Sequence, residues 1–261
     1  MTKKEVAVLK VEALDERTPY ANILVYGETG TGKTVFASTA PRPILWLESE
    51  GGTSSIGDKA GIDIARVAGL DTYREALVYL EKNDAKYKTV VIDSFTETLA
   101  AVLKEIMRAV KTLDPTRDEF APYFEEWQRL TGVMREIARA FRDLPMHVVI
   151  TALEREDKDD LTGRSKVRPR MTPALADELP GFMDAVVYLY AATEQKGEVD
   201  EGGVAESEEG LTVVRNGLIK PTGKYVAKAR IPEGDPTPDF IADPTFNKVA
   251  ELLGIPTQSP N

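Results

Sequence analysis

One short segment, YGETGTGKTVFAS at residues 26–38, restricts the possible folds more than any other part of the chain. It fits the pattern G-x-x-x-x-G-K-[ST], follows the apolar run ANILVYG, and precedes a helix-forming stretch that ends before Pro41. A strand, a glycine-rich loop and a helix in this order present backbone N–H groups and the positive end of a helix, where phosphate groups bind. The predicted phosphate-contacting residues are Gly27, Glu28, Thr29, Gly30, Thr31, Gly32, Lys33, Thr34 and Val35.

The rest of the chain alternates between strand-like and helix-like segments, as such a loop requires. Apolar, β-branched runs recur as PILWLE, TVVIDS, MHVVITA and DAVVYLY, and helical patterns separate most of them. The later runs LTVVRNG and KYVAKARI, joined by turn residues, predict a closing antiparallel pair. We therefore expect an α/β fold with a mostly parallel, twisted sheet flanked by helices.

Three helices are predicted between the strands. Residues 72–80 form a short amphipathic helix that begins with a capping-box pair, Thr72 and Glu75. Residues 99–110 and 120–141 carry apolar side chains three and four positions apart, which is typical of helices with one buried stripe. The stripe of the longer helix, expected in the core, includes Phe120, Tyr123, Phe124 and Trp127.

Changes in composition divide the chain into a core with appendages. With 261 residues, one core over residues 21–231 is expected, preceded by an extension at residues 1–20. Residues 194–210 are acidic and glycine-rich without periodicity, which predicts a mobile loop. Residues 232–261 form a proline-punctuated strap that leads to a small helix around residues 246–253.

Composition also excludes several classes of site. The chain has no cysteine, which rules out disulfides, thiolate metal sites and cysteine nucleophiles, and its single histidine, His147, is expected to be a strand residue without chemistry. No apolar run approaches the roughly 18 to 20 residues that cross a bilayer, so a cytoplasmic protein without a membrane partner is expected. A net charge of −10 argues against coating nucleic acid over the whole surface, but a local basic site remains compatible with it.

Acidic residues at two predicted strand ends complete a phosphate site. Asp93 follows TVVI and would supply a carboxylate to Mg²⁺ beside the Thr34 hydroxyl, while Lys33 would neutralise phosphate oxygens. Asp93 could also cap the next helix, and the two roles are compatible. Glu48 and Glu50 are two residues apart and are expected to point to the same side, where one of them would orient or deprotonate an attacking water.

The order of these elements resembles that of the RecA-like ATPases. The run LWLESEGGT is similar to the strand end where archaeal and eukaryotic recombinases carry a catalytic glutamate before a glycine, and Glu50 matches that position. The chain also resembles phage-encoded nucleotide-binding proteins of the AAA type, including core-only RecA-like proteins of single-strand annealing systems. The resemblance runs from about Asn22 to Ile231. It implies a RecA-like fold, ATP and Mg²⁺ as cofactors, and a homo-oligomer, ring or filament, in a bacterial or phage-infected host cell.

The same resemblance implies an active site between subunits, with a basic residue from a late strand reaching the neighbour's γ-phosphate. Lys228 and Arg230 alternate along YVAKAR and share one face, which makes them candidates for this catalytic role. Such residues contribute about 10³ to 10⁵ in rate in related enzymes. The alternative is that they protect a strand edge or simply meet water. Recombinases often carry Asn-Gln after the strand that resembles VVIT, whereas this chain has Thr151, Ala152 and Leu153 there.

A basic segment follows the strand that contains His147, and in the resembling family this region faces single-stranded DNA. A sequence-independent contact with phosphates is expected, because no aromatic residue interleaves the basic ones. The alternative is a solvated loop that pairs with its own acids. The predicted nucleic-acid residues are Arg164, Lys166, Arg168 and Arg170.

Three functional hypotheses remain. The first is an ATPase that assembles on single-stranded DNA in recombination or repair, of phage type, with an annealing or DNA-binding protein as a further partner. The second is a P-loop kinase of a small molecule, with GRSKVRPR as a lid. The third is a nucleotide-gated assembly protein with little hydrolysis. DNA-stimulated ATP hydrolysis separates the first from the other two.

Overall fold

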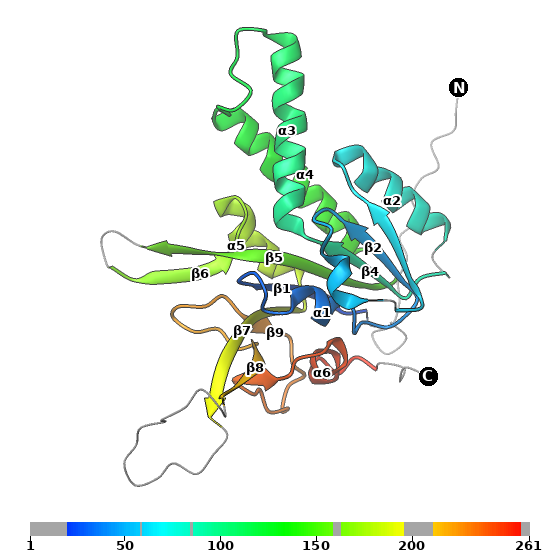
Figure 1. The fold of residues 1–261 in the computed structure, drawn as a ribbon, viewed down its shortest axis with the longest axis vertical. Helices are drawn as coiled ribbons and strands as arrows, with labels where there is room; N and C mark the ends of the chain where they lie inside the picture. Colours follow the sequence, from blue (N-terminus) through cyan, green and yellow to red (C-terminus); the bar gives the residue numbers. More distant parts are fainter. Residues whose placement is uncertain (1–19, 58, 84–85, 159–162, 196–210, 257–261) are drawn as a thin grey trace.

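The computed structural model describes residues 20–57, 59–83, 86–158, 163–195 and 211–256. One sheet of ten strands runs through this part of the chain, and helices cover both of its faces (Figure 1). The strands are β1 (Asn22–Gly27), β2 (Ile44–Glu48), β3 (Ile62–Arg66), β4 (Thr89–Asp93), β5 (His147–Lys158), β6 (Ser165–Pro169), β7 (Ala185–Gln195), β8 (Leu211–Leu218), β9 (Lys228–Ala229) and β10 (Phe240–Ala242). The helices are α1 (Lys33–Ala37), the 3₁₀ helix η2 (Gly52–Ile56), α2 (Leu70–Lys82), α3 (Phe95–Leu113), α4 (Phe124–Arg142), α5 (Pro173–Phe182) and α6 (Phe246–Leu252).

The central strands are parallel and lie in the order β3-β2-β4-β5-β1-β7. Their carboxyl ends therefore meet at one edge of the sheet, where Glu48 of β2 lies in register with Asp93 of β4. β5 lies between β4 and β1, so one strand separates Asp93 from Gly27, the last residue of β1. The expected α/β class, a mostly parallel sheet with antiparallel strands at its edge, is confirmed.

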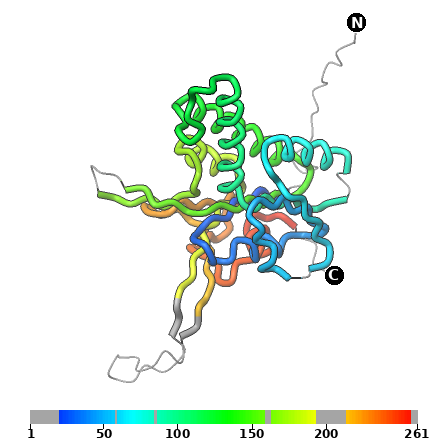
Figure 2. The backbone as a smooth tube through the Cα atoms, turned by 45° about the horizontal axis from the view of Figure 1, so that its top comes forward, coloured from blue at the N-terminus to red at the C-terminus, as the bar shows by residue number. Residues whose placement is uncertain are grey.

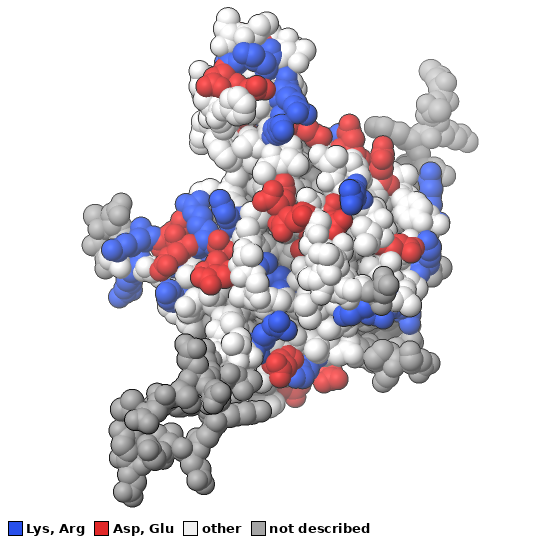
Figure 3. Space-filling model, in the orientation of Figure 1, with Lys and Arg blue, Asp and Glu red and all other residues white. Residues whose placement is uncertain are grey.

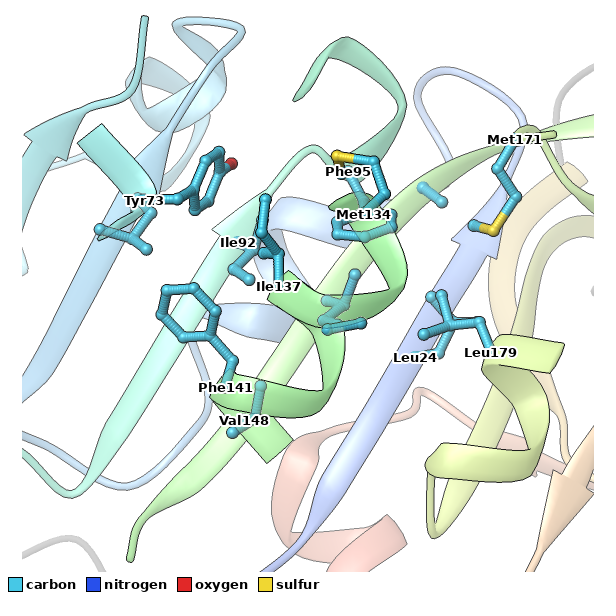
Figure 4. Close-up of a cluster of buried hydrophobic side chains, with 14 of the residues drawn as sticks. Leu24, Tyr73, Ile92, Phe95, Met134, Ile137, Phe141, Val148, Met171 and Leu179 are labelled. Atoms are coloured by element: carbon cyan, nitrogen blue, oxygen red, sulfur yellow. The ribbon is translucent and has the colours of Figure 1, made fainter. Parts of the chain in front are cut away.

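Alternation along the strands divides the core into two layers. Leu24 and Tyr26 of β1 belong to the layer beneath α2, α3, α4 and α5, while Ile23 and Val25 belong to the layer beneath α1 and α6. Figure 4 shows the first layer, with Ile137 of α4 packed near the sheet. Burial of such side chains stabilises the fold by roughly 1.5 to 3 kcal/mol each. Among the described residues, no helix combines the length and apolar content that crossing a bilayer requires.

The long helices differ from the sequence-based expectation at the end where they meet. α3 and α4 project from the body as a helical hairpin (Figures 1 and 2), and α4 begins at Phe124, so Phe120 and Tyr123 precede the helix. The four aromatic residues expected in the core are exposed, because the sheet does not extend beneath the tip of the hairpin. Their exposed fractions are 85% for Phe120, 57% for Tyr123, 70% for Phe124 and 43% for Trp127. The later part of the stripe is buried as expected, with Leu130, Met134, Ile137 and Phe141.

Two further features differ from the sequence-based expectation, namely the start of α2 and the pairing of β8 and β9. α2 begins at Leu70 after Gly69, so Thr72 lies inside the helix and does not open it in a capping box with Glu75. The predicted closing pair is also wrong in its partners, because β8 and β9 both pair with β7 and not with each other. The first residues of β7 pair with β9, and its later residues pair with β8. The two segments that the sequence predicted to pair with each other therefore lie along different parts of β7.

The predicted appendages lie partly outside the described residues. Of the extension at residues 1–20, the structure describes Tyr20 alone. The acidic loop predicted at residues 194–210 overlaps the end of β7, and residues 196–210 lie outside the described part of the chain. The small helix expected near the carboxyl end is α6. β10, which precedes it and pairs with β8, was not expected.

Candidate functional site

The predicted phosphate loop connects the carboxyl end of β1 to the start of α1. At residue 27 a Cβ atom would lie 2.2 Å from the carbonyl oxygen of Leu189, so only glycine allows β1 to end beside β7. Gly32 has φ +95° and precedes the first turn of α1, a conformation that favours glycine. Glu28, Thr29 and Gly30 are exposed, so the outer part of the loop is open to a ligand. These features provide the backbone geometry that a phosphate requires.

Lys33 lies inside the curve of this loop. Its Nζ donates hydrogen bonds to the carbonyls of Gly27 (3.1 Å) and Glu28 (2.7 Å). Burial lowers the pKa of the Lys33 ammonium, and the nearby carboxylates of Glu50 and Asp93 oppose this shift. The ammonium thus lies between the loop and two acidic side chains, where it can bind an anionic group.

Asp93 and Thr34 meet where β4 ends beside the start of α1. The Thr34 hydroxyl donates a 3.0 Å hydrogen bond to Oδ2 of Asp93, and the Thr151 hydroxyl donates a 2.5 Å bond to Oδ1. Burial raises the pKa of Asp93, while these two hydrogen bonds act in the opposite direction. Asp93 does not cap the following helix, because Ser94 is the N-cap residue of α3 and accepts a bond from the Glu97 amide.

The donor set at this point fits Mg²⁺ held together with phosphates. Among the described residues, no group of three or more His, Cys, Asp or Glu side chains could hold a metal by itself. Mg²⁺ in nucleotide sites is instead held by one or two protein oxygens, substrate phosphates and waters. Thr34 and Asp93 supply two such oxygens, and residue 52 lines the same space, since a Cβ there would lie 3.6 Å from the Thr34 hydroxyl oxygen.

The two candidate glutamates have different hydrogen-bond partners. Glu48 is buried; its Oε1 accepts a 3.2 Å bond from the Thr53 amide, and its Oε2 lies 3.9 Å from Nε of Arg66. Glu50 lies beyond the end of β2, where the chain bends, and its carboxylate accepts a hydrogen bond from the Ser94 hydroxyl. Strand alternation ends at Glu48, so the two-residue spacing no longer fixes the direction of Glu50. Glu50 is the glutamate beside Lys33 and Asp93.

The two candidate trans-acting residues lie at the opposite, amino end of the sheet. β9 pairs with the first residues of β7, and Nζ of Lys228 donates 2.9 Å bonds to the carbonyls of Pro180 and Met183 at the end of α5. Arg230 bonds to Asp184 (2.8 Å) and to the carbonyl of Gly181 (2.9 Å). Both side chains thus reach the same region, as their alternation predicts. Any contact with a neighbouring subunit stays a prediction.

The basic segment is a strand of a projecting hairpin and not an irregular loop. β5 and β6 extend away from the body, and basic and acidic side chains intermingle over them in Figure 3. Arg168 forms ion pairs with Asp157 and, at 3.3 Å, with Asp177. Lys166 lies opposite Asp157 in the register, while Arg164 and Arg170 are exposed at the two ends of β6. The segment therefore carries a basic strand whose charge is partly balanced within the chain.

A cavity that the sequence did not indicate adjoins the outer side of the phosphate loop. Its volume is about 720 Å³, and residues 28–31 and three tyrosines line it. The rings of Tyr188 and Tyr225 stack with centroids 4.5 Å apart, and Tyr190 stacks on Tyr188 at 5.9 Å. The tyrosines come from β7 and from the segment before β9, so only the fold brings them together.

The sequence also did not indicate Arg215 of β8, which lies beside the loop. Its Cδ and Nε lie 3.1 Å and 3.2 Å from the position that a Cβ would take at Gly32. No local pattern marks this arginine, because its place beside the loop results from pairing between β7 and β8. Gly52, which lines the Thr34 and Asp93 site, had a weak signal in the glycine pair that follows Glu50.

No curated protein matches the chain. Among solved structures, the chain matches a KaiC-like protein of the hyperthermophilic archaeon Pyrococcus horikoshii with 15% identity and a TM-score of 0.38, over 78% of this chain and 80% of that one. The sequence model of a family described as AAA domain matches residues 20–231, from before β1 to beyond β9. Because this match spans most of the chain, the protein belongs to the AAA domain family.

Proposed function

We propose that the protein binds ATP with Mg²⁺ at the loop between β1 and α1 and hydrolyses it to ADP and phosphate. The observation that supports this most strongly is the 3.0 Å contact between the Thr34 hydroxyl and the Asp93 carboxylate beside the Lys33 ammonium. The loop amides and Lys33 would bind the phosphates, and Thr34 and Asp93 would hold the metal. Bound Mg²⁺ neutralises charge on the transferred phosphoryl group.

Glu50 is proposed to orient or deprotonate the attacking water. Its side chain is exposed, its carboxylate is held by the Ser94 hydroxyl, and its charge acts on both Lys33 and Asp93. A base in this position would face the outermost phosphate without occupying the metal site. A positioned general base contributes about 10² to 10⁴ in rate.

We further propose that the ATPase assembles on single-stranded DNA as a homo-oligomer, ring or filament, in recombination or repair. The supporting observation is the projecting β5–β6 hairpin, whose base adjoins Thr151, the residue bonded to Asp93. A phage-type system and an annealing or DNA-binding protein as partner belong to the same proposal. Lys228 and Arg230 would then act on the site of a neighbouring subunit.

The hairpin gives less support to the small-molecule kinase alternative. A kinase lid must open and close, whereas β6 pairs with β5 along its length and bonds on its other side to the segment before β9. The Val167 amide donates a 2.7 Å bond to the carbonyl of Lys224, and the Val226 amide donates a 3.2 Å bond back to Val167. These bonds hold the segment on two sides.

The test is the rate of ATP hydrolysis with and without single-stranded DNA, together with the mass in solution with a non-hydrolysable nucleotide. We expect Mg²⁺-dependent hydrolysis, a higher rate with DNA and a multiple of the 28.7 kDa chain mass. A plot of the logarithm of the DNA association constant against the logarithm of salt concentration should have a slope of about −3 if all four basic residues contact phosphate, namely Arg164, Lys166, Arg168 and Arg170. The slope should be shallower if Arg168 keeps its ion pairs with Asp157 and Asp177. Phosphate transfer to an acceptor other than water would select the kinase instead.

A further inference from the structure

We propose that Arg215 contacts the phosphate groups of the bound nucleotide from within the same chain, as a second cationic residue beside Lys33. The inference rests on the proposed function, since it concerns the same loop. It differs from the expectation for Lys228 and Arg230, because Arg215 would act on its own chain's site and lies at the carboxyl end of the sheet.

Strand pairing places Arg215 on the face of the sheet where the loop enters α1. Arg215 lies opposite Ala191 in the antiparallel register of β7 and β8, two positions from the pair Leu189 and Gly217. Cross-strand partners share a face, and so do residues two positions apart. Leu189 packs in the same core layer as Phe36 of α1. Arg215 therefore lies on the α1 side, whereas the three tyrosines of the cavity lie on the other face.

The guanidinium lies against the backbone of the loop itself. Its Cδ, Nε and Cζ atoms are 3.1, 3.2 and 3.6 Å from the place of a Cβ at Gly32. Residue 32 immediately precedes Lys33 and Thr34, whose backbone and side chains form the proposed phosphate and metal site. The absence of a side chain at Gly32 leaves the guanidinium in contact with this part of the loop, within reach of a ligand bound there.

Arg215 differs from Arg168 and Arg230 in its bonding. Among the residues that the structure describes, no hydrogen bond or ion pair engages its guanidinium, whereas Arg168 and Arg230 both bond to carboxylates. A guanidinium offers five N–H donors in a planar fork that matches phosphate oxygens. A nucleotide phosphate bound at this loop would supply an anionic partner for the guanidinium. This arrangement fits a nucleoside di- or triphosphate.

The backbone at Arg215 is held firmly enough for a binding role. β8 pairs with β7 on one side and β10 on the other, and the Asp243 amide donates a 2.8 Å bond to the Arg215 carbonyl. The next residue, Asn216, is buried. The guanidinium thus projects from a fixed position, and its substitution is expected to leave the fold intact.

The experiment is titration of the full chain with Mg·ATP, Mg·ADP, adenosine and single-stranded DNA, using wild type, Arg215→Ala and Arg215→Lys. The matched control is Arg74→Ala on α2, an exposed arginine bonded to Asp71 at 3.1 Å. Arg215→Ala should weaken ATP and ADP binding by about tenfold, or about 1.4 kcal/mol, with adenosine and melting temperature unchanged. Arg215→Lys should recover part of the loss, and Arg74→Ala should bind as wild type does.

Three results would overturn the inference alone: ATP and ADP affinities of Arg215→Ala within twofold of a wild type that does bind them, a loss confined to single-stranded DNA, or an equal loss for adenosine. The second would assign the arginine to nucleic-acid phosphate. A wild type that binds no nucleotide would overturn the proposed function first, and the inference with it. An equal loss for adenosine would show that the arginine positions the nucleoside and not the phosphates.

Discussion

The two ends of the sheet hold their charged residues in different ways, and two lysines make the difference clear. Each donates hydrogen bonds to two backbone carbonyls, and burial lowers the pKa of both ammonium groups. Lys33, at the carboxyl end, bonds to residues five and six positions earlier in its own loop. Lys228, at the amino end, bonds to residues 45 and 48 positions earlier, at the end of α5.

The difference between the two sets of hydrogen bonds predicts different roles for the two lysines, one in ligand binding and one in stability. A ligand can replace the local bonds of Lys33 without loosening any contact between elements, because those bonds lie within one loop. The bonds of Lys228 join β9 to α5, so losing them weakens the tertiary structure. We therefore expect substitution of Lys33 to weaken nucleotide binding with little change in stability, and substitution of Lys228 to lower stability with little change in the chain's own nucleotide binding.

The largest effect is expected for Glu50→Gln at the carboxyl end. Removing the proposed base should lower turnover by about 10² to 10⁴, while ATP affinity and melting temperature stay close to wild type. Steady-state hydrolysis and equilibrium ATP binding measure the two quantities separately.

Glu48→Gln is the matched control for Glu50→Gln, since the two residues are two positions apart. Glu48 bonds to Thr53 and lies near Arg66, so its substitution should affect stability more than turnover. If Glu48→Gln silences hydrolysis and Glu50→Gln does not, the base has been assigned to the wrong acid.

The next largest effect is expected for Lys33→Ala. Loss of the ammonium should weaken ATP binding by about 100-fold or more, because the phosphates lose their nearest side-chain cation. The free energy of unfolding should change little, since only bonds within the loop disappear. Retained ATP affinity, measured by calorimetric titration, would refute the phosphate role of Lys33.

Lys228→Ala tests the amino end. It removes two charge-assisted hydrogen bonds at the end of α5 and should lower the free energy of unfolding by about 2 kcal/mol, with the chain's own ATP affinity unchanged. Denaturant titration measures the loss. The control, Lys220→Ala, affects an exposed lysine bonded to Asp239 at 3.0 Å and should stay within about 0.5 kcal/mol of wild type.

The same variant also tests action on a neighbouring subunit. A mixture of Lys33→Ala and Lys228→Ala chains contains interfaces where an intact loop meets an intact Lys228. If the residue acts in trans, the mixture should recover part of the hydrolysis that each variant lacks. No recovery at any ratio would leave Lys228 with its structural role alone.

The smallest effect concerns pH and His147, also at the amino end. Burial lowers the pKa of this histidine from its usual 6.5 to about 4, and its Nδ1 accepts a 3.0 Å bond from the Ala21 amide. Between these pH values the unfolded chain binds a proton that the folded chain does not, so the free energy of unfolding falls as pH falls through this window. Above pH 6.5 the group has no effect.

We expect this loss to be about 1 to 2 kcal/mol, less than the full shift implies because the imidazole is not wholly shielded from solvent. Urea unfolding of wild type and His147→Asn at pH 7 and pH 4.5 measures it, with asparagine able to accept the same hydrogen bond. Because the chain has a single histidine, its imidazole ring protons can be followed by NMR without overlap from other histidines. An imidazole that titrates near pH 6.5 would contradict the account.

The sequence predicted the parts of the site that local backbone determines. The glycines and Lys33-Thr34 specify the loop by themselves, and Asp93 follows from the position of a buried strand. The sequence could not predict the direction of Glu50, because that depends on where β2 stops and on Ser94 from another strand end. Arg215 was missed for the same reason, since only strand pairing brings it to the loop.

The errors in the fold have a similar cause. The periodicity of α4 predicts one apolar face along its whole length, but burial also requires an element opposite that face. The sheet provides one for Met134 and not for Phe124, which is 70% exposed. The partners of β8 and β9 likewise depended on β7, which offered both of them a free edge.

The most direct test of the central claim is a crystal structure of the chain with Mg²⁺ and a non-hydrolysable ATP analogue. We predict that the triphosphate lies inside the loop at residues 27–34, with the metal held by Thr34 and Asp93 and with Lys33 turned from the loop carbonyls to the phosphates. A nucleotide bound elsewhere with this loop empty, or a metal that Asp93 does not approach, would contradict it.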